Sequence, residues 1–147
     1  MNAITCETFI RLIPHFEEKP TREPGEGVNH EGWCDHLHTC ASCSDAVLTH
    51  RVRGWGIDPA AYPCVHMAYR ANQACPMHEE RAECPDLFVA YDEVFDEYSL
   101  IKDGVSLAIS FCPWCGTPLP PSQRQRWFAE LETLLGTSPL AAADKVP

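Results

Sequence analysis

The chain has 147 residues, 45% of them hydrophobic, and a formal net charge of −10. This length allows one ordinary domain or two very small ones. No run approaches the ~18 apolar residues of a transmembrane helix, and the first residues lack the basic-then-apolar pattern of a secretory signal. The acidic charge argues against nucleic-acid binding, because non-specific affinity for nucleic acids comes from cationic contacts to phosphate. We therefore expect a cytoplasmic protein that binds neither a membrane nor nucleic acid.

The N-terminal part of the chain predicts two helices and a polar loop. Apolar residues recur at helical spacing over 4–16, and a run rich in Pro and Gly follows over 17–29. A second helix is expected over 30–49. Residues 54–63 contain two Gly and two Pro, and we expect them to connect the helical segment 1–53 to a separate C-terminal domain.

Three strands are predicted next, over 87–91, 98–101 and 105–111. Asp103 and Gly104 separate the last two strands and are typical of a two-residue hairpin turn. An antiparallel meander follows from this order, in which the third strand ends beside the end of the first.

The last predicted element is a helix that begins at a Ser122-Gln125 capping box and ends before Gly136. Residues 137–147 are expected to form a flexible tail after a domain that spans 64–136. The predicted fold is thus α+β: an N-terminal helical pair, then a small three-stranded antiparallel sheet and a C-terminal helix. We expect the buried face of that helix to consist of Trp127, Phe128, Leu131, Leu134 and Leu135.

Nine cysteines in an intracellular chain favour metal ligation, because thiols stay reduced there and an odd count suits disulfides poorly. His36, Cys40 and Cys43 have the spacing H-x3-C-x2-C, which places all three on one face of a helix. The fourth ligand of this first site is expected to be Cys6, with Cys34 as the alternative.

A second site is predicted at Cys112 and Cys115, since Gly116 allows the positive φ that a metal knuckle needs. In the predicted meander, Cys84 lies at the opposite end of the sheet from Cys112, so it is expected either to be a buried thiol or to join a separate site with Cys75 and His78. We expect two Zn²⁺ per chain, without excluding a third. The candidates for completing the second site are Cys64, His66, Cys75, His78 and Cys84.

An enzyme is not favoured. The pair at Cys112 and Cys115 follows a late strand and precedes a Pro-rich turn, whereas redox pairs of this type lie at the start of a helix. Glu79, Glu80 and Glu83 lie near His78, but no HExxH motif is present. We expect a non-enzymatic zinc protein that binds another protein. The alternatives are a redox-sensing regulator that releases zinc on oxidation and a zinc enzyme with an open metal position.

Residues 4–50 resemble the zinc-binding anti-sigma factor domain. The residues that carry this resemblance are Cys6, His36, Cys40 and Cys43, although the loop is longer than in that family and Cys34 and His38 are additional donors. The resemblance implies a small helical domain that clasps a sigma factor, in some cases releasing it when thiols are oxidised. The acidic charge also suits a basic protein partner.

Residues from Cys64 to about Gly136 resemble an uncharacterised family of small bacterial and phage proteins with a Cys-Pro-Trp-Cys-Gly knuckle. This resemblance implies a compact zinc-binding α+β domain and brings no known activity. The residues that carry it are Cys64/Met67, Cys75/His78, Cys84 to Asp86, Asp96 to Tyr98, Asp103-Gly104, Cys112 to Gly116, Leu119-Pro120, Arg124 and Trp127-Phe128.

Overall fold

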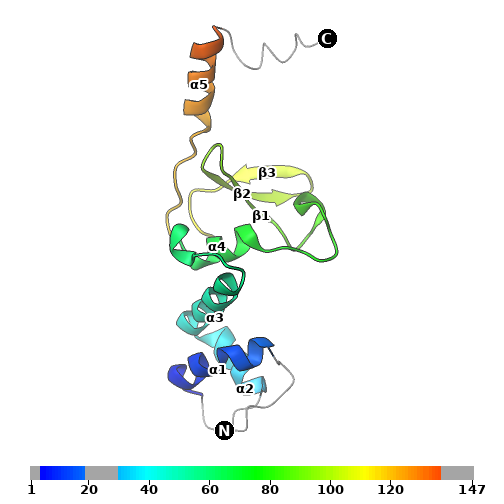
Figure 1. Ribbon diagram of the computed structural model, residues 1–147, viewed down its shortest axis with the longest axis vertical. Coiled ribbons are helices and arrows are strands. Elements are labelled where there is room, and N and C mark those ends of the chain that lie inside the picture. Colours follow the sequence, from blue (N-terminus) through cyan, green and yellow to red (C-terminus); the bar gives the residue numbers. More distant parts are fainter. Residues whose placement is uncertain (1–3, 19–29, 137–147) are drawn as a thin grey trace. The chain divides into compact units, whose positions relative to one another are not determined.

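The computed structural model describes residues 4–18 and 30–136. The chain divides into two compact units, residues 1–72 and 73–147, and each unit is described by itself (Figure 1). Helices before a small antiparallel sheet and one helix after it confirm the predicted α+β class. The predicted loop over 17–29 and the predicted tail fall almost entirely outside the described residues. The predicted connector over 54–63 stays a prediction.

Unit 1 is helical. It consists of α1 (Cys6–Glu18), α2 (His30–Thr39), α3 (Ala41–Gly54), the short 3-10 helix η1 (Pro59–Ala61) and α4 (Val65–Asn72). Figure 1 shows α1 and α2 lying beside α3. The predicted first helix is confirmed, with its bounds displaced by two residues.

The core of unit 1 lies between α1, α2 and α3. The Phe9 and Trp33 rings stack with their centroids 4.6 Å apart, and the Phe16 ring lies 4.8 Å from the Trp33 ring. Burying each such side chain stabilises the fold by about 1.5–3 kcal/mol. An ion pair at the edge of this core links Glu17, at the end of α1, to Arg51 on α3. In it, Arg51 Nη2 donates to Glu17 Oε1 at 2.9 Å.

The predicted single helix over 30–49 is wrong in one respect, because it is two helices that meet at Cys40. Cys40 has extended dihedral angles, φ −113° and ψ 103°, so it cannot continue the helix. Its amide still donates to the His36 carbonyl at 2.9 Å, and its carbonyl accepts from Ser44 at 2.9 Å. Both backbone groups of Cys40 are therefore satisfied while the chain changes direction.

Unit 2 contains a three-stranded antiparallel meander of order β1-β2-β3, as predicted. Its strands are β1 (Val89–Asp92), β2 (Glu97–Lys102) and β3 (Val105–Ala108), and the 3-10 helix η2 (Arg81–Glu83) precedes them. Asp103 and Gly104 both have positive φ, 51° and 77°, which confirms the predicted two-residue turn. The buried core residues of the unit are Cys84, Leu87, Val89, Tyr98, Cys112 and Leu119.

The third strand ends earlier than predicted, at Ala108, and the chain then forms a narrow hairpin. Phe111 pairs with Pro118 as an isolated antiparallel bridge, and the Leu119 amide donates to the Ser110 carbonyl at 2.9 Å. This hairpin carries the Cys112 to Gly116 segment at its tip.

Helix α5 (Arg124–Leu135) ends at Gly136, whose φ of 66° confirms the predicted left-handed cap. Its start differs from prediction, because the N-cap is Gln123 and makes no side-chain cap bond. The predicted buried face is also wrong: α5 has no buried residue, and Leu134 is 82% exposed. Phe95 covers part of this apolar stripe, with its ring centroid 5.4 Å from that of Trp127 and 6.1 Å from that of Phe128. Helical periodicity alone therefore overestimated how much of the stripe is buried.

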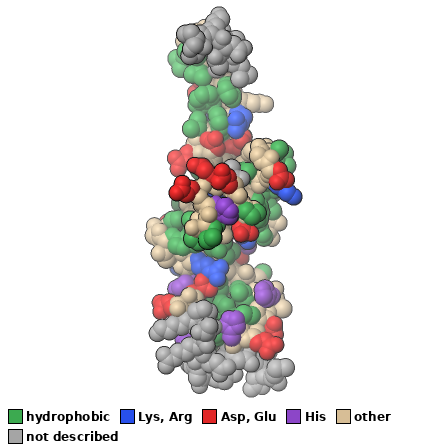
Figure 2. Space-filling model, turned by 90° about the vertical axis from the view of Figure 1, so that its right-hand side faces the viewer, with side chains coloured by type: hydrophobic (Ala, Val, Ile, Leu, Met, Phe, Trp, Pro, Cys, Tyr) green, Lys and Arg blue, Asp and Glu red, His purple; other side chains and the backbone are tan. Residues whose placement is uncertain are grey.

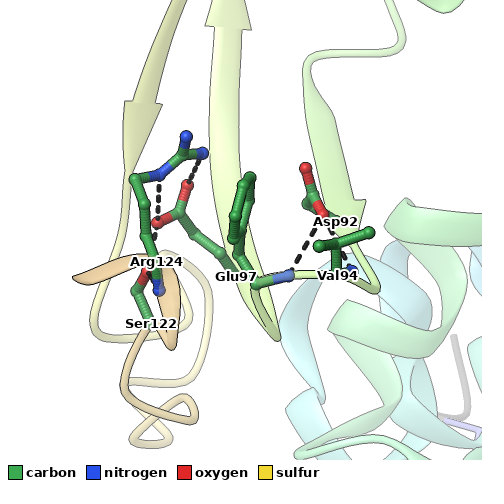
Figure 3. A network of polar contacts seen from close by, with 6 residues as sticks. Asp92, Val94, Glu97, Ser122 and Arg124 are labelled. Atoms are coloured by element: carbon green, nitrogen blue, oxygen red, sulfur yellow. Dashed lines mark hydrogen bonds and ion pairs between the residues drawn. The ribbon is translucent and has the colours of Figure 1, made fainter. Parts of the chain in front are cut away.

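A polar network also holds the start of α5. Arg124 donates to both Glu97 carboxylate oxygens, at 2.8 and 3.4 Å, and the Ser122 hydroxyl donates to the same carboxylate (Figure 3). The Arg124 guanidinium also lies 4.1 Å from the Phe95 ring centroid. These contacts connect the first turn of α5 to the β1–β2 hairpin.

Candidate metal centres

Each unit contains a group of cysteine and histidine side chains that could hold a metal ion, counted over residues 4–18 and 30–136. In both groups the donor atoms all lie within 4.8 Å of one another. Unit 1 also carries the pair Cys64 and His66, and unit 2 also carries the pair Cys112 and Cys115.

The group within unit 1 draws its donors from three helices and the break between two of them. Cys6 is the first residue of α1, His36 lies on α2, Cys43 lies on α3 and Cys40 lies at the break. The Cys6 and Cys40 sulfurs are 3.8 Å apart, and His36 Nε2 is 3.3 Å from the Cys43 sulfur. Two thiolates bound to one tetrahedral zinc at about 2.3 Å stand roughly 3.8 Å apart, so this spacing suits zinc.

The electrostatics of this group also suit a cation. Backbone N–H donation from Cys43, at the start of α3, lowers the pKa of the Cys40 thiol. Burial raises the pKa of the Cys43 thiol to about 12, and hydrogen bonding to Cys40 adds to the rise. A buried Cys43 thiolate therefore needs a neighbouring positive charge, which a divalent ion supplies as the thiols lose their protons.

Cys34, the alternative to Cys6, lies outside this group. Its sulfur is 3.7 Å from both ring nitrogens of His30, one turn earlier on α2. The geometry thus brings Cys6, and not Cys34, to His36 and its partners.

Unit 1 also carries Cys64 and His66 at the start of α4. The Cys64 carbonyl accepts from the Ala68 amide at 3.1 Å and so begins the helix. His66 Nε2 lies 3.4 Å from the Asp45 carboxylate on α3. In metal sites such a carboxylate orients the imidazole and leaves the other ring nitrogen, here Nδ1, to bind the ion. Asp45 had no signal in the sequence, since its role depends on how α3 and α4 pack.

Unit 2 carries Cys112 and Cys115 in the predicted knuckle. The Cys112 amide donates to the Thr117 carbonyl and the Gly116 amide donates to the Cys112 carbonyl, both at 2.9 Å. Gly116 has φ +71°, as the knuckle prediction requires. Cys112 is buried, whereas Cys115 is exposed, with its sulfur 3.1 Å from the Thr117 hydroxyl.

The group within unit 2 consists of Cys75, His78 and Cys84. The Cys75 sulfur lies 3.2 Å from His78 Nδ1, and this hydrogen bond is the main reason that the pKa of Cys75 falls to about 7. Cys84 follows η2 and is buried. Cys84 is thus buried and also lies with Cys75 and His78, so its role as a ligand of a separate site stays a prediction.

Arg81 braces the segment that carries these three donors. Its guanidinium donates to the Val89 carbonyl at 2.9 Å and to the Gln73 carbonyl at 2.8 Å. These bonds tie the chain just before Cys75 to the first strand. The donors are thus held on a loop that is fixed at both ends.

None of the described helices is both long and apolar enough to cross a membrane. No curated protein and no solved structure matches the chain. A family model described as "Domain of unknown function (DUF6980)" matches residues 61–147, which include Cys64, His66 and the donors of unit 2. The match does not cover the segment that resembles the anti-sigma domain, and that resemblance stays a prediction. The chain therefore belongs to the DUF6980 family, over the part that follows its first three helices.

Proposed function

We propose that the protein binds three zinc ions and acts by binding another protein rather than by catalysis. The observation that carries this proposal is the group of Cys6, His36, Cys40 and Cys43, which supplies four donors at zinc spacing from separate helices. Four protein ligands close a zinc ion to water, and such sites stabilise folds.

We propose that the knuckle of Cys112 and Cys115 holds the third zinc ion, and that Cys64 and His66 are the first candidates, among those predicted from the sequence, for its two other ligands. The support is chemical: a knuckle of two thiolates needs two more ligands, and the Asp45 carboxylate already orients the His66 ring. Both pairs also fall inside the family match.

The protein partner is proposed from charge. The formal charge of −10 falls to about −12 with three ions, because each Cys3His site contributes −1 and the Cys2His site contributes none. On the face that Figure 2 presents, Asp and Glu side chains gather near the middle of the view. A basic partner suits this charge. An anti-sigma-like regulator is the narrower form of the proposal, and a reducing, cytoplasmic compartment suits nine cysteines that form no disulfide with one another.

The experiment for the metal sites is elemental analysis of the purified full chain. We expect three zinc ions per chain, one for each of the two groups and one for the knuckle. Cys6→Ser should hold the zinc of its group less tightly and release it at a lower concentration of a competing chelator, because only three donors remain in that group. Cys34→Ser is the matched control on the neighbouring helix and should release zinc as the unaltered chain does. Fewer than three zinc ions in the unaltered chain would contradict the proposal. Affinity capture from the native host tests the protein partner.

Redox sensing is a second candidate, favoured by one observation. Cys6 is exposed, and its sulfur lies 3.8 Å from that of Cys40. Peroxide would take two electrons from these thiols, forming one disulfide while it is reduced to water, and the zinc would leave. We expect zinc release to rise with peroxide dose in the unaltered chain and to be slower in Cys6→Ala loaded with zinc. Equal release rates in both would contradict this candidate.

A further inference from the structure

A cavity of about 470 Å³ lies in unit 2 beside the Cys75, His78 and Cys84 group. Its volume falls within the range of small-molecule sites in proteins, about 300–1,000 Å³. Cys84 belongs to both features, since it lines the cavity and is one of the three donors. One of the three residues that would hold an ion in this group is therefore also part of the cavity wall.

The donor set of this group has three members. Across the described residues, no Asp, Glu or further Cys or His joins Cys75, His78 and Cys84. Tetrahedral zinc with three protein ligands keeps its fourth position for water or another small ligand. This group therefore differs from the four-donor group of unit 1, which is closed by its own side chains.

The cavity walls indicate what kind of molecule would occupy that position. Pro85, Phe88, Leu100 and Ile101 provide apolar surface. The cavity is also lined by the carboxylates of Glu83 and Asp103 and the ammonium of Lys102, so its walls carry a formal charge of −1. Zinc with two thiolates and one imidazole is neutral, so the site has no net attraction for an anion.

We propose that this cavity binds a small neutral molecule that has an apolar body and an aromatic nitrogen donor. The nitrogen takes the fourth position of the zinc held by Cys75, His78 and Cys84, displacing water. The apolar body lies against Phe88 and Ile101. Nitrogen is a preferred zinc ligand, and the apolar walls add affinity in proportion to the surface they bury.

This inference rests on the zinc occupancy proposed above for the group within unit 2. The test uses the full chain with Co²⁺ in place of zinc, because the visible absorption of tetrahedral cobalt changes when a ligand is exchanged. The probes are 4-phenylimidazole, which has both the donor and the apolar body, and imidazole, which has the donor alone. We expect both to change the spectrum, with 4-phenylimidazole binding about tenfold more tightly.

Variants separate the roles of the donor and the wall. Phe88→Ala and, as a second wall variant, Ile101→Ala should each remove most of the preference for 4-phenylimidazole while leaving imidazole binding unchanged. Val105→Ala changes an exposed residue outside the cavity lining and should keep the full preference. Cys84→Ser should lose cobalt from this group and the spectral response with it.

The outcomes distinguish this inference from the proposed function. Three bound cobalt ions with no spectral response to either probe would overturn the open position and leave the zinc proposal standing. Two bound ions, with Cys84→Ser causing no further loss, would show that this group holds no metal and would overturn both. Equal affinity for the two probes would overturn the part assigned to the apolar walls.

Discussion

Gly116 is the residue whose backbone conformation shapes the knuckle of unit 2. Its φ is +71°, and no heavy atom lies within 4 Å of the position that a Cβ would take. A larger side chain would therefore meet backbone strain and no steric clash. The knuckle turn depends on this conformation, because the Gly116 amide donates to the Cys112 carbonyl.

Gly116→Ala is expected to lower the free energy of unfolding by about 1 kcal/mol, because L-residues are strained at positive φ. Gly54→Ala is the matched control, since Gly54 ends helix α3, also has open space around it and does not have a positive φ. That change should be neutral or stabilise by up to about 1 kcal/mol. Denaturant unfolding of both variants measures the difference, and equal effects would contradict the role given to the turn.

At the scale of elements, helix α5 depends on the carboxylate of Glu97. Hydrogen bonding from Arg124, with a further bond from Ser122, lowers the pKa of Glu97. A carboxylate whose folded pKa is lowered contributes stability above its unfolded pKa of about 4.3. That contribution is lost as the pH falls through the lowered folded pKa.

Glu97→Gln should therefore lower the free energy of unfolding near neutral pH and have little effect on it at acid pH, where Glu97 is protonated. The cost at neutral pH is expected to be below about 1 kcal/mol, since Arg124 is half exposed. Glu93→Gln is the control, because Glu93 is exposed in the same hairpin, and it should change the free energy of unfolding at neither neutral nor acid pH. Urea unfolding of each variant at several pH values gives the difference from the unaltered chain. A constant difference across the acid range would contradict this account.

The elements differ in how well the sequence predicts them. The β2–β3 hairpin is predicted because Asp103 and Gly104 specify their turn locally. The break at Cys40 is not predicted, because residues 30–49 have helical periodicity throughout. Both backbone groups of Cys40 are also hydrogen-bonded, so no special residue is needed there. The exposure of α5 is also missed, since a periodic apolar stripe such as that of Leu134 and Leu135 does not tell whether another element covers it.

The candidate metal ligands likewise divide into those that the sequence predicts and those that it does not. The three-residue spacings of Cys40 to Cys43 and Cys112 to Cys115 indicate metal knuckles from the sequence alone. The assignment of Cys84 to Cys75 and His78 needed the path of the chain through η2. Residue spacing shows which thiols can turn toward one ion, whereas tertiary packing decides which distant donors join them.

At the scale of the whole molecule, we expect zinc binding to be coupled to folding. Over residues 4–18 and 30–72, unit 1 has a core cluster of seven buried residues, and one of them, Cys43, is itself a candidate ligand. A core of this size stabilises a fold only marginally, so small domains often depend on a metal. Removing the ion would also remove the link that its ligands make between α1, α2 and α3.

Removing zinc from the full chain with a chelator should therefore unfold the helices of unit 1. Adding zinc back should restore them. Far-UV circular dichroism follows the helices, and tryptophan emission includes the signal of Trp33, which is buried against Phe9 and Phe16 and is one of four tryptophans in the chain. Cys34→Ser is the control and should respond as the unaltered chain does. Full helical content without zinc would contradict the coupling.

The helix break at Cys40 also bears on how this sequence can vary in length. His36 and Cys43 lie on separate helices, α2 and α3, on either side of it. One residue added between either of them and Cys40 would rotate that donor by about 100° around its helix axis, away from the ion. Residues added between α1 and α2 would leave both rotations unchanged. Among homologues that share the site, we expect insertions and deletions to collect before His30 and to be absent between His36 and Cys43.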